Sequence, residues 1–201
     1  RRTPQLISKP TPPGEITQSY SEPLDGLEQA QVEIDFSLGT LTVISLPSGS
    51  LNFVEADSTA RNADMRVDFS RQDSEGKLYL TKKQGDVPFS SEGDNRYQVR
   101  LTRNIPMTLD IKSSASDNEL DLSELQVTEL RLNMDAGKCK VTMPSSAETV
   151  HAYIKANVAN VEINIPDGVA AKIQADINLS AFDINGSRFS KQGDYYISED
   201  F

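Results

Sequence analysis

The chain has 201 residues, and its 20 Lys and Arg against 30 Asp and Glu give a net charge of −10 at pH 7. Because a protein that faces phosphates usually carries a basic patch, this balance opposes a nucleic-acid partner. The single cysteine, Cys139, excludes an internal disulfide framework and a thiolate metal site, and the single histidine, His151, leaves little room for histidine-based chemistry.

The first 23 residues are rich in proline and poor in large apolar side chains. Five of the ten prolines fall here, together with Ser, Thr, Gln and Gly. This composition predicts an extended tether, with the folded part beginning near Leu24. The chain begins with Arg1 rather than Met, so we expect a mature form whose signal peptide or lipid anchor has been removed. No apolar run approaches the roughly 18 residues of a membrane-spanning helix.

From Leu24 onward apolar and polar residues alternate, and the period is two rather than that of a helix. Clear examples are Val32, Ile34 and Phe36, then Leu130, Leu132 and Met134, and then Val161, Ile163 and Ile165. This alternation is typical of strands with one buried face. No convincing amphipathic helix occurs, so the sequence predicts an all-β fold.

The same strands repeat at a fixed spacing. An inward residue in one strand is followed nine positions later by an inward residue in the next, and five pairs share this offset. The pairs are Ile34 and Val43, Ile111 and Leu120, Leu132 and Val141, Ile154 and Ile163, and Ile173 and Phe182. The first members of the last four pairs are 21, 22 and 19 residues apart. A period of about 20 residues with two short strands per repeat predicts a single-stranded β-solenoid, a β-helix-like stack with regular coils over about 109–185.

Two corners recur in each predicted coil. The corner between the strands is small or polar, as in 37–39 and 135–137, because a coil that reverses and stacks closely needs small side chains or a positive φ. The corner after the second strand carries Pro47, Pro144 or Pro166. Proline there removes the N–H that would continue the sheet and fixes φ for the bend.

A stretch over about 47–108 separates the first coil from the others. It contains alternating segments at 65–69 and 78–80, joined by turn-forming residues, and a further segment at 97–101. We interpret it as an inserted β-hairpin followed by a return strand. Residues 24–201 are therefore predicted to form a single β-solenoid domain behind the tether of residues 1–23.

Several segments, taken in order, resemble a known family. They are LDGLE at 24–28, VEI at 32–34, GTLTV at 39–43, IPMTLDI at 105–111, LDLSEL at 120–125, and 130–144. Their order and spacing resemble the toast-rack N-terminal domain, and with it the bacterial cell wall-active antibiotics response proteins (LiaF C-terminal-like) and the adhesin-like families with the same repeats. The resemblance implies an exported β-solenoid that is tethered to the bacterial envelope, with no catalytic residues to carry over.

The sequence departs from that family pattern in two places. The Gly-x-Gly turns are reduced to Ala136-Gly137 and to the residues at 157–160. The strand expected after 195–197 is missing, so we expect an uncapped C-terminal coil. A free strand edge favours edge-to-edge self-association.

His151 and Cys139 are the only residues of their types, and each has a plain interpretation. His151 alternates with Val150 and Ala152, which places it on the outer face beside Tyr153. Catalysis would require a positioned partner, and the sequence supplies none. Cys139 is in phase with Val141 and therefore predicts a buried small side chain rather than an exposed nucleophile.

Two groups of carboxylates allow alternative chemistry. Asp117, Glu119, Asp121 and Glu124 could hold Ca²⁺, but their spacing fits no calcium-loop motif, and a solvated charged edge is the favoured interpretation. Asp135, Glu162 and Asp183 could stack on one face across coils, the arrangement that polysaccharide-cleaving β-helices use. These carboxylates keep open the alternative of a carbohydrate-active enzyme.

The leading interpretation is a non-catalytic, extracytoplasmic domain of the cell envelope, tethered to the bacterial membrane through a segment absent from this chain. A solenoid suits this role because its flat faces grow with repeat number and need no pocket. We expect a sensor-like or adhesin-like module whose partner is an envelope or membrane protein. No catalytic, cofactor-binding or metal-ligating residue is predicted.

Overall fold

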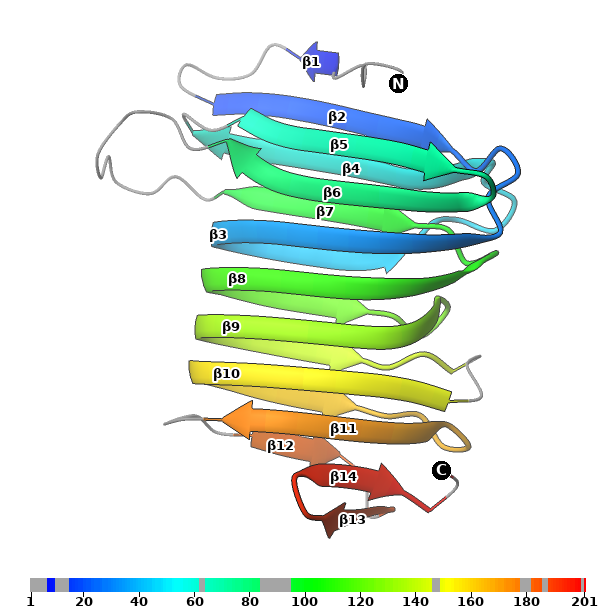
Figure 1. Cartoon of the computed structure of the whole chain (residues 1–201). Coiled ribbons are helices and arrows are strands. Elements are labelled where there is room, and N and C mark those ends of the chain that lie inside the picture. Colours follow the sequence, from blue (N-terminus) through cyan, green and yellow to red (C-terminus); the bar gives the residue numbers. More distant parts are fainter. Residues whose placement is uncertain are drawn as a thin grey trace.

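The computed structural model describes residues 7–9, 15–61, 64–83, 95–145, 149–177, 182–185, 188–199 and 201. Throughout these ranges the regular secondary structure is β-strand, and the strands join into one 14-stranded sheet. The sheet doubles back into a front and a back layer, with the apolar core between them (Figure 1). The predicted all-β fold is confirmed.

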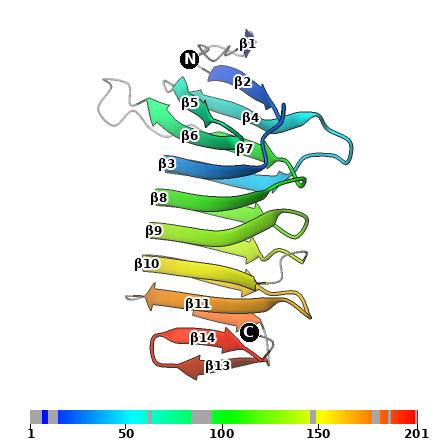
Figure 2. The same cartoon turned by 45° about the vertical axis from the view of Figure 1, so that its right-hand side comes forward.

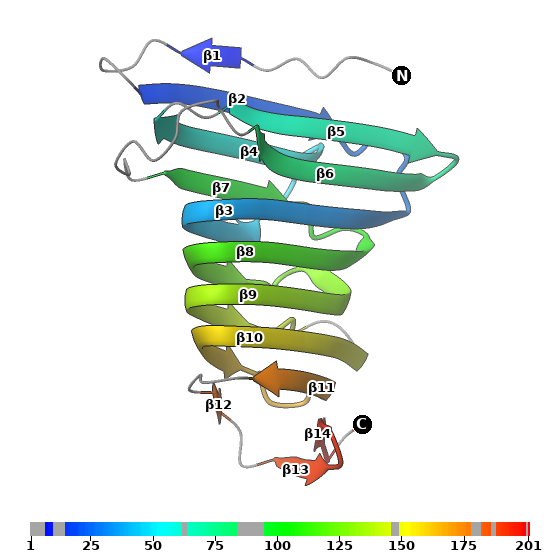
Figure 3. The ribbon, with the colours of Figure 1, turned by 60° about the vertical axis from the view of Figure 1, so that its left-hand side comes forward.

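Four long parallel strands form the repeating part, which we call the coil stack. They are β3 (Gln29–Ser45), β8 (Pro106–Asp121), β9 (Gln126–Thr142) and β10 (Thr149–Asn164). Each passes from the front layer to the back layer through one bend (Figure 3). Below β10, β11 (Ala170–Ile177) extends the front layer and β12 (Phe182–Asn185) extends the back layer. The predicted solenoid of stacked coils is confirmed.

The coils stack in register, and this alignment builds the core. Ile34, Ile111, Leu132 and Ile154 occupy equivalent positions in the front layer. Nine residues later, Val43, Leu120, Val141 and Ile163 do the same in the back layer. All eight side chains are buried, at 2% exposure or less. Each coil therefore buries its apolar face against its neighbours and against its own second half.

The bend differs from the prediction of two separate strands per coil. Pairing continues through it, because Ala136 and Gly137 remain in register with Ala115 and Ser116 of the coil above. Each coil is therefore one continuous, sharply bent strand.

Glycine is required at two of these bends. Gly39 and Gly137 have φ values of 117° and 111°, which L side chains rarely adopt. A Cβ on Gly137 would collide with the backbone carbonyl of Ser116, and one on Gly39 with that of Asn95. The close approach of neighbouring strands at this corner thus requires glycine, which has no side chain.

Five strands form an N-terminal cap above the coil stack. In the back layer β2 (Glu15–Pro23), β4 (Asn52–Arg61) and β7 (Arg96–Leu101) lie in that order, with β7 next to β3. In the front layer β5 (Asp64–Gln72) and β6 (Glu75–Lys83) form the predicted hairpin, with β6 next to β3. The return strand at 97–101 is confirmed as β7, whereas β4 was not predicted. A short strand, β1 (Ile7–Lys9), pairs with β2.

The prediction that the folded part begins near Leu24 is wrong. β2 pairs with β4 along its whole length, and its Gln18 and Tyr20 are buried. Gln18 Oε1 accepts a hydrogen bond of 2.6 Å from the backbone N–H of Met65, which joins the back layer to β5. Residues 15–23 are thus part of the cap, and the tether prediction for 1–6 and 10–14 falls outside the described residues.

The expectation of an uncapped C-terminal coil is also wrong for the front layer. β13 (Phe189–Gln192) and β14 (Tyr195–Ser198) form an antiparallel hairpin below β11 (Figure 2). β14 pairs with β11, and the Ser198 hydroxyl accepts a hydrogen bond of 2.8 Å from the backbone N–H of Ala171. The chain thus reverses to cover the edge of β11, which removes part of the basis for edge-to-edge self-association.

Candidate functional site

Outward side chains of the front layer form columns, because parallel in-register strands place equivalent residues side by side. One column runs through Glu33, Asp110, Arg131, Tyr153 and Gln174. The neighbouring column runs through Asp35, Lys112, Asn133 and Lys155, and the backbone of Asp176 is next in register. These columns change character along the stack, from acidic near β3 to cationic and aromatic near β10.

The upper part of these columns is occupied by internal ion pairing. Lys112 Nζ lies 2.6 Å from Glu33 Oε1. Asp110 is in register with Glu33. Desolvation raises the pKa of the Asp110 carboxyl above its usual value. Lys112 opposes this shift, and Glu33 adds to it. Glu33 and Lys112 therefore satisfy each other, whereas Asp110 Oδ1 has no hydrogen-bond partner among the described residues.

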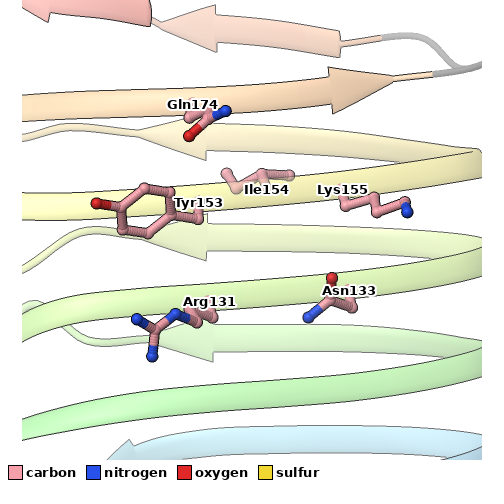
Figure 4. Close-up of a pocket in the computed structure, with 6 residues that line it drawn as sticks. All are labelled: Arg131, Asn133, Tyr153, Ile154, Lys155 and Gln174. Carbon is pink, nitrogen blue, oxygen red and sulfur yellow. The ribbon is translucent and has the colours of Figure 1, made fainter.

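The lower part contains a hollow of about 240 Å³ on the outer face of β9, β10 and β11. Arg131, Asn133, Tyr153, Lys155 and Gln174 surround it, with the backbone region of Ile154 between them (Figure 4). The Tyr153 side chain is 38% exposed. The hollow therefore combines an exposed aromatic ring, two cations and two side-chain amides.

Cation–aromatic contacts continue from the hollow toward the C-terminus. The Arg131 guanidinium lies 5.8 Å from the centre of the Tyr153 ring and forms an ion pair with Glu129. Lys172 Nζ lies 4.3 Å from the centre of the Tyr195 ring and 6.0 Å from that of Phe201. We call Arg131, Asn133, Tyr153, Lys155, Lys172, Gln174 and Tyr195 together the lower front face.

His151 and Cys139 lie where the sequence places them. His151 is partly exposed on the outer face of β10, in register with Glu129 and Lys172, and its ring meets that of Phe201 edge-on at 5.7 Å. Cys139 is 2% exposed, and burial raises the pKa of its thiol to about 12. A buried thiol with such a pKa is not a nucleophile at neutral pH.

The acidic cluster predicted as a possible calcium site is dispersed. Asp117 and Glu119 lie in register with Lys138 and Lys140 of the next coil. Asp121 accepts hydrogen bonds from the backbone and hydroxyl of Ser123. Glu124 accepts one from Ser45 and pairs with Arg103, and these partners lower the pKa of its carboxyl. Within the described ranges no group of His, Cys, Asp and Glu could hold a metal ion.

The three carboxylates considered for catalysis do not share a face. Glu162 and Asp183 are in register in the back layer, and Lys140 Nζ lies 3.8 Å from Glu162 Oε1. Asp135 lies at the bend between the layers, where the Asn157 amide donates a hydrogen bond of 3.0 Å to it. Glu162 and Asp183 are therefore neighbouring positions of the back layer, and Asp135 lies apart from both at the bend.

The lower front face was not predicted as a site, and of its residues Tyr153 was assigned to the outer face from the sequence. A signal was present, since Arg131 and Tyr153 are 22 residues apart, as are Asn133 and Lys155. That spacing equals one coil, so each pair had to become neighbours across the sheet. The repeat length that aligns the inward residues therefore also aligns these outward ones and predicts that they are neighbours.

Comparisons with known proteins agree on the architecture. The family model for the N-terminal domain of toast_rack, DUF2154, matches residues 11–164. A "putative cell adhesion protein" of Clostridium sporogenes has a TM-score of 0.74 at 17% identity, covering 99% of this chain and 89% of that one. At this identity the likeness shows a shared fold.

Other comparisons contribute less. A "putative adhesin" of Parabacteroides distasonis covers 84% of this chain and 96% of its own at 11% identity, with a TM-score of 0.32, which does not establish a shared fold. No protein with a curated description matches the chain in sequence. Among the described segments none is a helix with the length and apolar content of a membrane span.

Proposed function

The chain belongs to the family of toast_rack N-terminal domains, and from that premise we propose that it is a non-catalytic, adhesin-like binding module of the bacterial envelope. The observation that carries the proposal is the register of the coil stack, which fixes outward side chains in columns on two flat layers. Rigid strands hold such side chains at defined distances without any conformational change. A surface of this kind is suited to recognition of an extended partner.

The candidate chemistry of the described residues also favours binding over turnover. Cys139 is buried with a raised pKa, and Glu162 is paired with Lys140. Nucleophilic or general acid–base catalysis requires an accessible group with a positioned partner. The partner that we propose is another envelope or membrane component, and the location that we propose is outside the cytoplasm, with the domain tethered to the membrane.

Location is tested on cells that produce the full-length native protein. We expect the protein to fractionate with membranes. We also expect an added protease to cleave it in cells whose outer layers have been made permeable but whose cytoplasmic membrane is still closed. A cytosolic control protein in the same cells should remain intact. Recovery in the soluble cytoplasmic fraction, protected from protease until lysis, would contradict the proposed location.

Binding is tested by co-sedimentation of the purified chain with isolated envelope fragments. We expect saturable binding that is weakened by one of two charge-matched variants and not by the other. The front-layer variant is Arg131→Gln with Lys155→Gln, and the back-layer variant is Lys138→Gln with Lys140→Gln. Sedimentation that neither variant affects, or release of reducing sugars that a single Asp→Asn change abolishes, would overturn the proposal of a non-catalytic binding face.

A further inference from the structure

We propose that the lower front face binds an anionic oligosaccharide, with Tyr153 as the stacking platform and with Arg131 and Lys155 contacting its carboxylates. This inference rests on the proposed binding function and names the class of ligand. It depends on three features of the described residues: the arrangement of side chains around the hollow, the local charge, and the absence of a free strand edge there.

The arrangement around the hollow matches the two faces of a sugar ring. Tyr153 presents an exposed apolar ring, on which the C–H face of a pyranose can lie. Asn133 and Gln174 lie on either side of β10, on β9 and β11. Their side-chain amides can both donate and accept hydrogen bonds, as sugar hydroxyls do. The aromatic ring, which lies between Arg131 and Gln174, and the Asn133 amide beside Lys155 therefore supply both kinds of contact.

The charge of this face is opposite to that of the chain. The protein carries −10 overall, yet Arg131, Lys155 and Lys172 lie on three successive strands. Arg131 forms its ion pair with Glu129, and Lys155 is in register with Asp176. In the described part of the chain, neither Lys155 nor Lys172 forms an ion pair. Lys155 thus remains available for a ligand carboxylate, Lys172 lies over the Tyr195 ring, and the planar Arg131 fork adds directional hydrogen bonding.

A peptide fits the same surface less well. Extended peptides usually bind by adding a strand to a free sheet edge, or they insert apolar anchors into a pocket. β9, β10 and β11 each pair on both sides in the front layer, so no edge is free at the hollow. Four of the six residues that line the hollow are polar or charged, although apolar atoms of their stems and of Tyr153 supply most of its surface. The observations favour a hydroxyl-rich anionic ligand.

The test uses isothermal titration of the full chain with a hexameric oligogalacturonate. The same oligomer with its carboxylates reduced to alcohols is the neutral probe, and an oligoglutamate of equal charge is the peptide probe. The variants are Tyr153→Ala and Lys155→Gln. Their matched controls are Tyr79→Ala, which removes an outward tyrosine of the front layer on β6, and Lys138→Gln, which removes an exposed lysine of β9 in the back layer.

We expect the oligogalacturonate to bind, and each site variant to weaken it by about ten-fold, the loss that corresponds to one good contact. The controls should bind as the parent does, and the neutral probe should bind less well than the charged one. Equal binding of oligoglutamate, with no effect of Tyr153→Ala, would overturn the proposal in favour of simple charge attraction. No binding of any probe would overturn it too, while co-sedimentation with envelope fragments would still support the proposed function.

Discussion

The coil stack and the N-terminal cap enclose one continuous core, but they satisfy its polar groups differently. In the coil stack the buried Asn118 amide accepts a hydrogen bond of 2.9 Å from Ser116 and donates one of 3.1 Å to Ser113, all within one bend. In the cap the buried Ser58 and Tyr97 hydroxyls have no hydrogen-bond partner among the described residues. In the coil stack Asp110 Oδ1 has none either. The two regions therefore differ in the sequence separation of the partners, which is 5 residues for Asn118 and Ser113 and 47 residues for Gln18 and Met65 of the cap.

The aromatic side chains show a second contrast. Phe36 of the first coil stacks on Tyr97 of β7, with ring centres 3.9 Å apart and planes inclined by 9°. Phe53 of β4 meets Phe69 of β5 across the two layers at 5.9 Å. At the position of Phe36 the coils below contain smaller or non-aromatic side chains, namely Ser113, Met134 and Ala156. The coils below thus pack this row without aromatic rings, whereas the first coil and the cap fill their core with paired aromatic side chains.

The largest expected effects test whether the two regions unfold together. Phe53→Ala in the cap and Leu132→Ala in the coil stack should each cost about 2–5 kcal/mol of unfolding free energy, because both side chains are fully buried. Since the sheet is continuous through β3, we expect one urea transition, by circular dichroism and by tyrosine fluorescence, that both substitutions shift. Two transitions, of which each variant moves only one, would contradict a single folding unit.

A second test concerns the close approach of coils. Gly137→Ala should lower the unfolding free energy by about 3 kcal/mol or more, because it adds overpacking against Ser116 to backbone strain. Gly168→Ala is the matched control, since Gly168 also has a positive φ, of 78°, but nothing lies within 4 Å of its added Cβ. The control should cost about 1–2 kcal/mol. Equal midpoints in urea for the two variants would show that stacking distance does not limit the bend.

Each region buries one weakly acidic side chain, a tyrosine in the cap and a cysteine in the coil stack, and both predict that stability depends on pH in the alkaline range. Burial raises the pKa of Tyr97 in the cap from 10.0 to about 12, and that of Cys139 in the coil stack from 9.0 to about 12. The unfolded chain therefore loses these protons before the folded chain does, and stability should fall as pH rises from about 9 to 12.

Replacing these groups should reduce that dependence. The double variant Tyr97→Phe with Cys139→Val keeps the apolar packing, and its urea midpoint should fall less between pH 8 and pH 11 than the parent's. Burial also raises the pKa of Tyr20, with the Glu22 hydrogen bond adding to the effect, but Tyr20 is present in both proteins. An identical fall in the two midpoints would mean that neither Tyr97 nor Cys139 keeps its proton in the folded state.

The contrast between the regions also explains what the sequence could predict. The offset of nine residues and the period of about 20 identify the coils, since each coil repeats the same inward pattern. β2 and β4 lack such a pattern: β2 buries Gln18, and β4 buries the small side chains of Ala56, Ser58 and Ala60. Gln18 can be buried because the backbone N–H of Met65 donates a hydrogen bond to its side chain, and Met65 lies 47 residues further along the chain. The antiparallel pairing of β14 with β11 likewise breaks the repeat and has no local signal.

The smallest expected effects come from a contact at the junction of the two regions and from an ion pair on the surface of the coil stack. Arg103 follows β7, and its Nη2 donates a hydrogen bond of 2.7 Å to the Leu46 carbonyl at the end of the first coil, while Nη1 donates one of 3.0 Å to Glu124. Arg103→Ala should cost about 1–2 kcal/mol, since it leaves a partly buried carbonyl without its charged donor. Lys112→Ala removes only the pair with Glu33, in which both side chains are more than 40% exposed, and should cost less than about 1 kcal/mol.

Salt distinguishes the two effects, because ions screen an exposed pair far more than a hydrogen bond to a backbone carbonyl. In 1 M NaCl the cost of Lys112→Ala should vanish, whereas most of the cost of Arg103→Ala should remain. A cost for Arg103→Ala that disappears with salt would mean that Arg103 acts only through Glu124. The cap and the coil stack would then be joined at this corner by their strands alone, and the difference between the two regions would lie wholly in their cores.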